Sequence, residues 1–239
     1  MLDQHFMIDK ELLLRIIKIS KLNKEDIVLE IGPGTGNLTE LIANKAKHLY
    51  VIEKDSELFE ELNEKFASPK ITLIHDNAAK AKFPNFNKCI SNLPYTLCET
   101  LLWKFTRYKF ESLTLVVPKN FTDLILNKNP SRLQLLVDSY YNVELIEEIS
   151  PESFEPQPKV LSALIQITPK ETKSFIKEFL SQYDKKTKNA LKEILMKKGL
   201  TKQQALEKIS LNLRPKIQDT NIINLSLQEI QEIENKFKK

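Results

Sequence analysis

Hydrophobic residues in the first part of the chain follow two alternating patterns. Short apolar runs, typical of buried strands, are separated by stretches whose apolar residues recur at helical spacing. The predicted strands are 27–31, 48–52, 71–75, 88–91, 112–117, 143–149 and 161–168, and the predicted helices are 12–19, 38–46, 55–66, 97–105, 121–126 and 132–140. Strands that alternate with helices of this length predict a mostly parallel α/β sheet covered by helices on both faces.

The pattern changes after Pro169, where only helical periodicity remains. Apolar residues form one stripe with Phe175, Ile176, Phe179 and Leu180 and another with Leu191, Ile194 and Leu195. Gly199 suits the left-handed end of a helix, and the segments 201–204 and 226–229 have the pattern of capping boxes. We therefore predict an α/β domain over residues 1–169 and a small all-helical domain over residues 170–239.

The chain has only 4 glycines, and Gly32, Gly34 and Gly36 fall directly after the first predicted strand. At a strand-to-helix turn, glycines let the backbone turn sharply and pass close to a ligand. Their spacing is G-x-G-x-G rather than the G-x-G-x-x-G of dinucleotide-binding proteins, which disfavours NAD. Glu30, just ahead of the turn, suits a positively charged ligand better than a pyrophosphate. A tight turn that binds nothing is the alternative.

Two carboxylates stand at the ends of the next two predicted strands. Glu53 follows Gly32 by 21 residues and can accept hydrogen bonds from both hydroxyls of a ribose. Asp76 can accept from an adenine amino group while a backbone N–H serves a ring nitrogen. An exposed glutamate before a turn and a capping aspartate are the alternatives. Because ligands of open α/β sheets bind at the carboxyl ends of neighbouring strands, the three positions together favour an adenosyl ligand.

The segment Asn92-Leu93-Pro94-Tyr95 follows the fourth predicted strand. Pro94 fixes its own backbone and restricts Leu93, which turns carbonyl oxygens toward the side of the Asn92 side chain. Two acceptors that converge on one amino group would orient its lone pair toward an electrophile, and Tyr95 offers a ring for stacking on a base. A proline turn with a gap-filling aromatic residue is the alternative.

Taken together, these residues resemble the KsgA/Dim family of S-adenosylmethionine-dependent rRNA adenine N6-dimethyltransferases over nearly the whole chain. The matching segments are Gln4-His5-Phe6-Met7, Glu30 to Gly36 with Leu38-Thr39, the run Phe154-x-Pro156-x-Pro158-Lys159-Val160-x-Ser162, and Arg214-Pro215 with Leu225-Ser226. The resemblance implies that His5 and Met7 touch the methyl donor. It places Glu53, Asp76 and Asn92 at the family's ribose, adenine and amino-group positions. It also implies that Phe154 stacks on a flipped base, opposite Tyr95.

The same resemblance implies a Rossmann-like class I methyltransferase sheet with a small helical C-terminal domain that binds rRNA. The implied reaction dimethylates the N6 amino groups of two adjacent adenines near the 3′ end of small-subunit rRNA, in a precursor ribosomal subunit, with S-adenosyl-L-methionine as methyl donor. A large-subunit rRNA methyltransferase of the resistance type is the runner-up, against which Arg214-Pro215 argues. A non-catalytic ribosome assembly factor is a third hypothesis, against which Asn92, Pro94 and Tyr95 argue.

The chain departs from the family pattern at two places. Asp3 stands where the family has glycine, the basic tail ahead of it is missing, and Met7 replaces a leucine. Tyr183-Asp184-Lys185 stands where the family has Arg-Arg-Lys, which removes two arginines from the expected rRNA-binding domain.

Charge is distributed unevenly along the sequence. The net charge of +4 combines 20 Lys and Arg with 23 Asp and Glu over residues 1–169, and 16 with 9 over residues 170–239. Residues 185–216 hold 10 basic and 2 acidic residues. Such a segment is typical of phosphate contact, with a solvated lysine-rich helix face as the alternative.

Composition disfavours several other classes of protein. No apolar run approaches the ~18 residues of a membrane helix, and the N-terminus lacks the pattern of a signal peptide. Cys89 and Cys98 form no CxxC pair and have no partner for nucleophilic catalysis, so a reducing cytoplasm is the expected compartment. His5, His48 and His75 lack metal-ligand spacing, so we expect no metal site, and a monomer is the default expectation.

Overall fold

The computed structural model describes residues 4–126, 131–171 and 174–238. The chain forms two compact units, one of Met1–Asn127 with Tyr141–Pro169 and one of Lys128–Tyr140 with Lys170–Lys239. Residues 131–140 precede residue 169 in the sequence yet fall in the helical unit. The reason is that helix α6 (Arg132–Tyr140) packs on α7 (Phe175–Leu180), where the Tyr140 hydroxyl donates to the Lys177 carbonyl.

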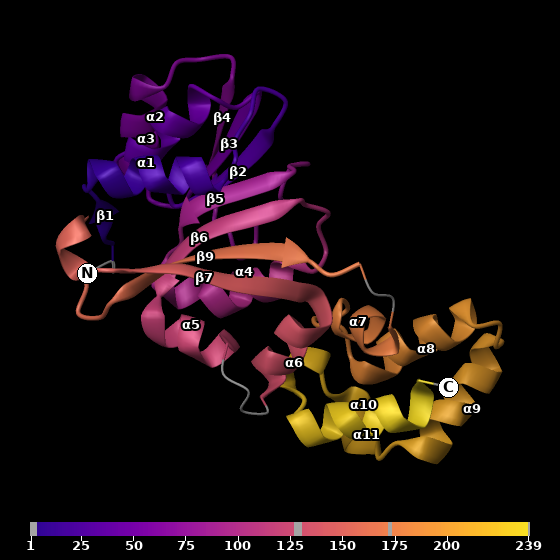
Figure 1. Cartoon of the computed structure of the whole chain (residues 1–239). Helices are drawn as coiled ribbons and strands as arrows, with labels where there is room; N and C mark the ends of the chain where they lie inside the picture. The colour runs from indigo at the N-terminus through magenta and orange to yellow at the C-terminus, as the bar shows by residue number, and fades with distance from the viewer. Residues whose placement is uncertain (1–3, 127–130, 172–173, 239) are drawn as a thin grey trace. The chain divides into compact units, whose positions relative to one another are not determined.

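A seven-stranded sheet forms the centre of the α/β unit among the described residues. Its strands are β2 (Ile27–Ile31), β3 (His48–Glu53), β4 (Ile71–His75), β5 (Lys88–Asn92), β6 (Ser112–Pro118), β7 (Tyr141–Ile149) and β9 (Ser162–Pro169). They lie in the order β4-β3-β2-β5-β6-β9-β7, and β9 alone runs opposite to the other six strands (Figure 1). The strand order reverses between β2 and β5, so a crevice is expected at the carboxyl ends of these two strands.

Helices cover both faces of this sheet, as the sequence pattern predicts. Helices α1 (Lys10–Ile19), α2 (Asn37–Ala43) and α3 (Ser56–Lys65) lie on one side, and α4 (Cys98–Phe105) and α5 (Lys119–Leu126) on the other (Figure 1). Apolar residues of α1 and α2 are buried against β2, β3 and β5 in one hydrophobic cluster. Burial of this apolar surface is the main stabilising contribution of the layered arrangement.

A short pair of strands closes the unit near the N-terminus. Strand β1 (Phe6–Met7) runs antiparallel to β8 (Phe154–Glu155), with Phe6 opposite Glu155 and Met7 opposite Phe154. The pairing joins the first and last parts of the unit across almost 150 positions of sequence. Because each strand has two residues, no periodicity in the sequence could predict it.

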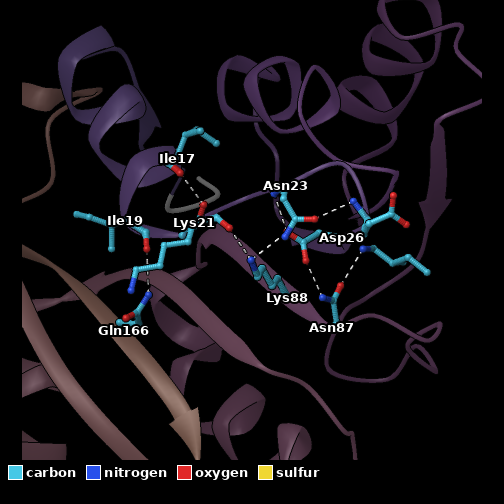
Figure 2. A network of polar contacts seen from close by, with 11 residues as sticks. Ile17, Ile19, Lys21, Asn23, Asp26, Asn87, Lys88 and Gln166 are labelled. Carbon is cyan, nitrogen blue, oxygen red and sulfur yellow. Dashed lines mark hydrogen bonds and ion pairs between the residues drawn. The ribbon is translucent and has the colours of Figure 1, made fainter.

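A buried ion pair links the amino ends of β2 and β5 (Figure 2). Lys88 Nζ lies 2.9 Å from Asp26 Oδ2 and donates to the Lys21 carbonyl at 2.8 Å, while Asn87 Nδ2 donates to Asp26 Oδ1 at 2.7 Å. Burial alone would raise the pKa of Asp26, but the Lys88 and Asn87 hydrogen bonds hold it below its ordinary value. This network lies at the end of the sheet away from the expected crevice.

The helical unit contains, after α6 and α7, the helices α8 (Thr187–Lys197), α9 (Lys202–Asn212), α10 (Pro215–Asp219) and α11 (Leu227–Phe237). Both predicted capping boxes are confirmed, with reciprocal bonds between Thr201 and Gln204 and between Ser226 and Glu229. Gly199 has φ +99° just past α8, as expected for a left-handed helix end. None of the helices in the described ranges has the length and apolar character that crossing a bilayer requires.

Candidate active site

A cavity of about 390 Å³ opens at the carboxyl ends of β2, β3, β4 and β5. The predicted site residues that line it are His5, Met7, Gly32, Glu53, Asp76, Asn92, Leu93, Pro94 and Tyr95. They come from five separate segments of the chain, so the fold brings together what the sequence spreads over about 90 positions. This placement agrees with the rule that open α/β sheets bind ligands at such a reversal of strand order.

The glycine-rich turn between β2 and α2 forms one wall of the cavity. Gly34 has φ +57°, and a Cβ placed on it would lie 2.6 Å from the Phe6 ring. A Cβ on Gly32, whose φ is +67°, would lie 3.2 Å from Pro94. The turn therefore needs glycine for its left-handed backbone and for its close approach to β1 and to the segment after β5.

Glu30 supplies a buried carboxyl group beneath this turn. Its side chain is 1% exposed although it borders the cavity, and its Oε2 has no hydrogen-bond partner among the described residues. Burial raises the pKa of Glu30 to about 8; the neighbouring Thr39 hydroxyl lowers it and the charge of Glu53 raises it further. A cationic group beside Glu30 would favour its ionised form, so the cavity fits a ligand that carries a positive charge.

Glu53 is the last residue of β3, and Asp76 directly follows the adjacent strand β4. Glu53 Oε1 accepts from the N–H groups of Lys54 at 2.7 Å and Asp55 at 2.8 Å. Burial raises the pKa of Glu53, and these two N–H groups oppose the rise. The Asp76 N–H donates to the Glu53 carbonyl at 3.0 Å, and Asp76 Oδ1 accepts from the Asn77 N–H at 2.6 Å. Both carboxylates are thus oriented by backbone groups at one edge of the cavity.

Asn92 is the last residue of β5, and His5, the residue before β1, fixes the orientation of its amide. Asn92 Nδ2 donates to the His5 carbonyl at 2.9 Å, so the other end of the amide is the carbonyl Oδ1. This Oδ1 is buried and accepts no hydrogen bond from the part of the chain that the structure describes. A buried acceptor without a donor costs free energy, so the site lacks one N–H donor at the position where the sequence predicts an amine.

Tyr95 begins a short 3-10 helix, η1 (Tyr95–Leu97), directly after Pro94. Its hydroxyl shares a hydrogen bond of 2.5 Å with Ser162 Oγ at the start of β9, and its ring centre lies 5.6 Å from that of His5. His5 Nδ1 in turn lies 2.8 Å from the Pro156 carbonyl. Residues of β9 and of the N-terminal segment therefore hold the Tyr95 ring at the cavity wall.

Among the predicted site residues, Phe154 alone does not line the cavity. Its side chain is 1% exposed and packs in the hydrophobic cluster with Met7, Leu12 and Ile149. In this structure Phe154 is a core residue, and its stacking on a flipped base opposite Tyr95 stays a prediction. Pairing of β8 with β1 turns the ring inward, where burial of an aromatic surface is favourable.

Two polar residues of the site were not singled out as functional from the sequence. Ser162 contacts Tyr95, and Asn37 Nδ2 donates to the Met7 carbonyl at 2.9 Å. Ser162 is the last residue of the motif that starts at Phe154, and this motif is the sequence signal that could have identified it. The only sequence signal for Asn37 is its position directly after Gly36. Both residues hold the segments that position Tyr95, His5 and Met7.

The other candidate groups take no part in the cavity. Burial raises the pKa of the Cys89 and Cys98 thiols to about 12, so both are protonated and unreactive at neutral pH. The described residues contain no group of His, Cys, Asp and Glu that could hold a metal ion.

Several lysines of the basic segment 185–216 already have carboxylate partners inside the helical unit. Lys185 lies 2.7 Å from Glu193, and Lys188 lies 2.7 Å from Asp219, which Lys186 also approaches to 3.4 Å. These ion pairs are exposed or half-exposed and therefore weak. Phosphate groups could compete for the same lysines.

Comparison with known proteins extends these observations. The family profile described as "Ribosomal RNA adenine dimethylase" matches residues 1–238. A protein named "Probable ribosomal RNA small subunit methyltransferase A" from Thermococcus kodakarensis is 32% identical over 249 residues, which cover 100% of this chain and 89% of that protein. The protein of the same name from Thermococcus gammatolerans is 39% identical over 179 residues, which cover 73% of this chain and 64% of that relative.

Solved structures give the same result at the level of the fold. The crystal structure of a dimethyladenosine transferase from Plasmodium falciparum has a TM-score of 0.68 and 25% sequence identity to this chain, and the match covers 97% of this chain and 98% of that one. The Rossmann-like methyltransferase sheet and the helical C-terminal region are therefore confirmed, and S-adenosylmethionine is the methyl donor. Because the profile spans nearly every residue, the chain belongs to the ribosomal RNA adenine dimethylase family, whose members are rRNA-modifying enzymes.

Proposed function

We propose that this chain transfers methyl groups from S-adenosylmethionine to the N6 amino groups of two adjacent adenines near the 3′ end of small-subunit rRNA. The observation that carries the proposal is the buried Asn92 Oδ1, an acceptor that lacks a donor among the described residues. An adenine amino group would supply that donor. The names of the relatives from Thermococcus favour the small ribosomal subunit over the large one.

The carboxylates of the cavity would bind the methyl donor. We assign Glu53 to the ribose hydroxyls, Asp76 to the adenine amino group, and Gly32 with His5 and Met7 to the walls around the donor. The positive charge of the donor would favour the ionised form of Glu30, and this carboxylate would in turn stabilise the donor. When bound, S-adenosylmethionine supplies a methyl group made electrophilic by its sulfonium.

On the acceptor side, methyl transfer needs correct placement of the adenine amine rather than a strong base. Asn92 Oδ1 and the Leu93 carbonyl would accept the two N–H groups of the amine, which directs the nitrogen lone pair to a methyl carbon ~3 Å away. Pro94 holds this turn, and the Tyr95 ring would stack on the base. Taking the base out of its stack costs a few kcal/mol and favours unpaired adenines. A proton leaves after each transfer, so a second methylation can follow.

The helical unit would hold the rRNA backbone in this proposal. Its lysines supply positive charge for phosphates, and the substrate would be a precursor of the small subunit. We also propose that the enzyme acts as a monomer in the cytoplasm, where its two free cysteines would stay reduced.

The test is transfer of labelled methyl groups to immature small subunits. We expect Asn92→Ala to lower the rate of transfer at least about 100-fold, because the developing positive charge on the amine loses an acceptor placed for it. Affinity for S-adenosylhomocysteine should change far less than the rate. Asn142→Ala is the matched control, since Asn142 is exposed on β7 and does not line the cavity.

Two outcomes would contradict the proposal in different ways. Transfer that survives Asn92→Ala would reject the assignment of the acceptor site. A wild-type chain that binds small subunits tightly and transfers no methyl group would favour the assembly factor, and transfer only to large-subunit RNA would favour the resistance-type enzyme.

A further inference from the structure

Lys104 is a buried lysine beneath the adenine side of the cavity. It lies in the last turn of α4, on the face of the sheet opposite α1 to α3, and is 6% exposed. Its Nζ donates to the Ala78 carbonyl at 2.5 Å and also to the Ala81 carbonyl. The same Nζ lies 4.0 Å from the centre of the Phe83 ring.

All three contacts fall on the loop that follows β4. This loop begins with Asp76 and Asn77, which line the cavity together with Ala78. The N–H groups of Lys80 and Ala81 both donate to the Asn77 carbonyl at 2.8 Å, so residues 77–81 form a tight turn around the ammonium group. The loop thus borders the cavity through residues 76–78 and contacts Lys104 through Ala78, Ala81 and Phe83.

An apolar side chain would fill this position without the free-energy cost of burying a charge. The Ala78 and Ala81 carbonyls explain why a cation is present, because without it two buried acceptors would lose a charge-assisted donor. The ring of Phe83 adds a cation–π contact. The charged groups whose fields reach Nζ are Asp76, at the end of β4, and Arg107, just after α4.

We propose that Lys104 is a positioning residue for methyl-donor binding: its ammonium group holds the loop of residues 76–83 in the shape that presents Asp76 to the adenine. The inference rests on the proposed function only in assigning the adenine to Asp76. Lys104 does not line the cavity, so it would act through the loop and touch neither donor nor acceptor.

The test compares two buried lysines of the same unit. Lys104→Met removes the donor and keeps most of the volume. We expect its Kd for S-adenosylhomocysteine, measured by calorimetry without RNA, to rise at least about 10-fold. Amide hydrogen exchange should become faster at residues 78–83 and stay unchanged in the strands.

Lys88→Met is the matched control, because Lys88 is 7% exposed and bonded at the other end of the sheet (Figure 2). It should lower the unfolding temperature yet leave the Kd of the folded protein within about 2-fold of wild type. Unchanged affinity and unchanged loop exchange in Lys104→Met would overturn the proposal. Failure of the wild-type chain to bind S-adenosylhomocysteine would instead contradict the proposed function.

A second measurement follows the pH dependence of ligand affinity. Burial lowers the pKa of Lys104 to about 8, Asp76 opposes this and Arg107 adds to it. Raising the pH from 7 to 9 should therefore discharge most of the ammonium and weaken its bonds to the loop. Affinity for 5′-methylthioadenosine, a probe that is uncharged over this range, should fall several-fold more in wild type than in Lys104→Met, because Glu30 ionises over the same range in both proteins. Equal pH profiles of the two proteins would overturn the proposal.

Discussion

Glu30 gives the donor cavity a charge that depends on pH. Its carboxyl group is buried with one oxygen unpartnered among the described residues, and its pKa is raised to about 8. In the unfolded chain the same group has an ordinary pKa near 4.5. Between these two values the folded protein retains a proton that the unfolded chain has lost. Stability therefore falls as the pH rises through this window, and the full loss is reached above pH 8.

At the residue scale we predict that Glu30→Gln removes this dependence. The amide has the same shape and no charge to bury, so the unfolding temperature between pH 5 and 8.5 should fall less steeply than in wild type, and affinity for S-adenosylmethionine should drop. Calorimetric scans across this range check the first effect. Parallel curves for the two proteins would show that folding leaves the pKa of Glu30 unchanged.

At the element scale, the turn between β2 and α2 depends on its packing against β1. A side chain on Gly34 would be strained by the left-handed backbone and would collide with Phe6. The collision would displace β1 and with it the adjoining residue His5, whose carbonyl orients the Asn92 amide. Donor and acceptor sites are thus linked through a strand of two residues.

Gly34→Val should therefore abolish binding of S-adenosylmethionine, while the helical unit keeps its helices and its contacts with RNA. Titration calorimetry with the donor and a separate binding assay with rRNA distinguish the two effects. Donor affinity equal to wild type would show that the glycines form only a tight turn.

At the scale of the whole molecule, the positive charge is concentrated in residues 170–239, whereas the unit with the cavity is slightly acidic. Some of this charge is already paired within the helical unit, as for Lys186 and Lys188 with Asp219. Lys202 and Lys216 are exposed and lie in the same basic segment. Binding of rRNA should therefore depend unequally on these lysines.

We predict that Lys202→Gln combined with Lys216→Gln lowers the slope of log affinity against log salt by about 2, one for each lost phosphate contact. Lys186→Gln combined with Lys188→Gln should have a smaller effect, because Asp219 already offsets part of that charge. Fluorescence anisotropy with an rRNA fragment at several salt concentrations provides the slopes. A slope equal to wild type in the first double variant would contradict phosphate binding by this segment.

Most of the elements were predictable because their signals are local. The predicted strands 27–31 and 71–75 and helix 132–140 have the bounds found in the structure, and the caps at Thr201 and Ser226 are as expected. Apolar periodicity and capping depend on residues a few positions apart. For the same reason the polar residues at strand ends could be assigned to one cavity once the sheet was predicted to be parallel.

Sequence by itself thus determined the layered α/β fold, the helical C-terminal region and the polar residues at the ends of the strands. Only the tertiary structure decided that Phe154 is buried, that residues 131–140 fall in the helical unit, and that Lys104 bonds to the loop after β4. These outcomes depend on partners far apart in the chain, such as Tyr140 and Lys177, which are separated by 37 positions. Whether an aromatic ring or an ammonium group is buried depends on what the folded chain packs around it, and no local pattern records those neighbours.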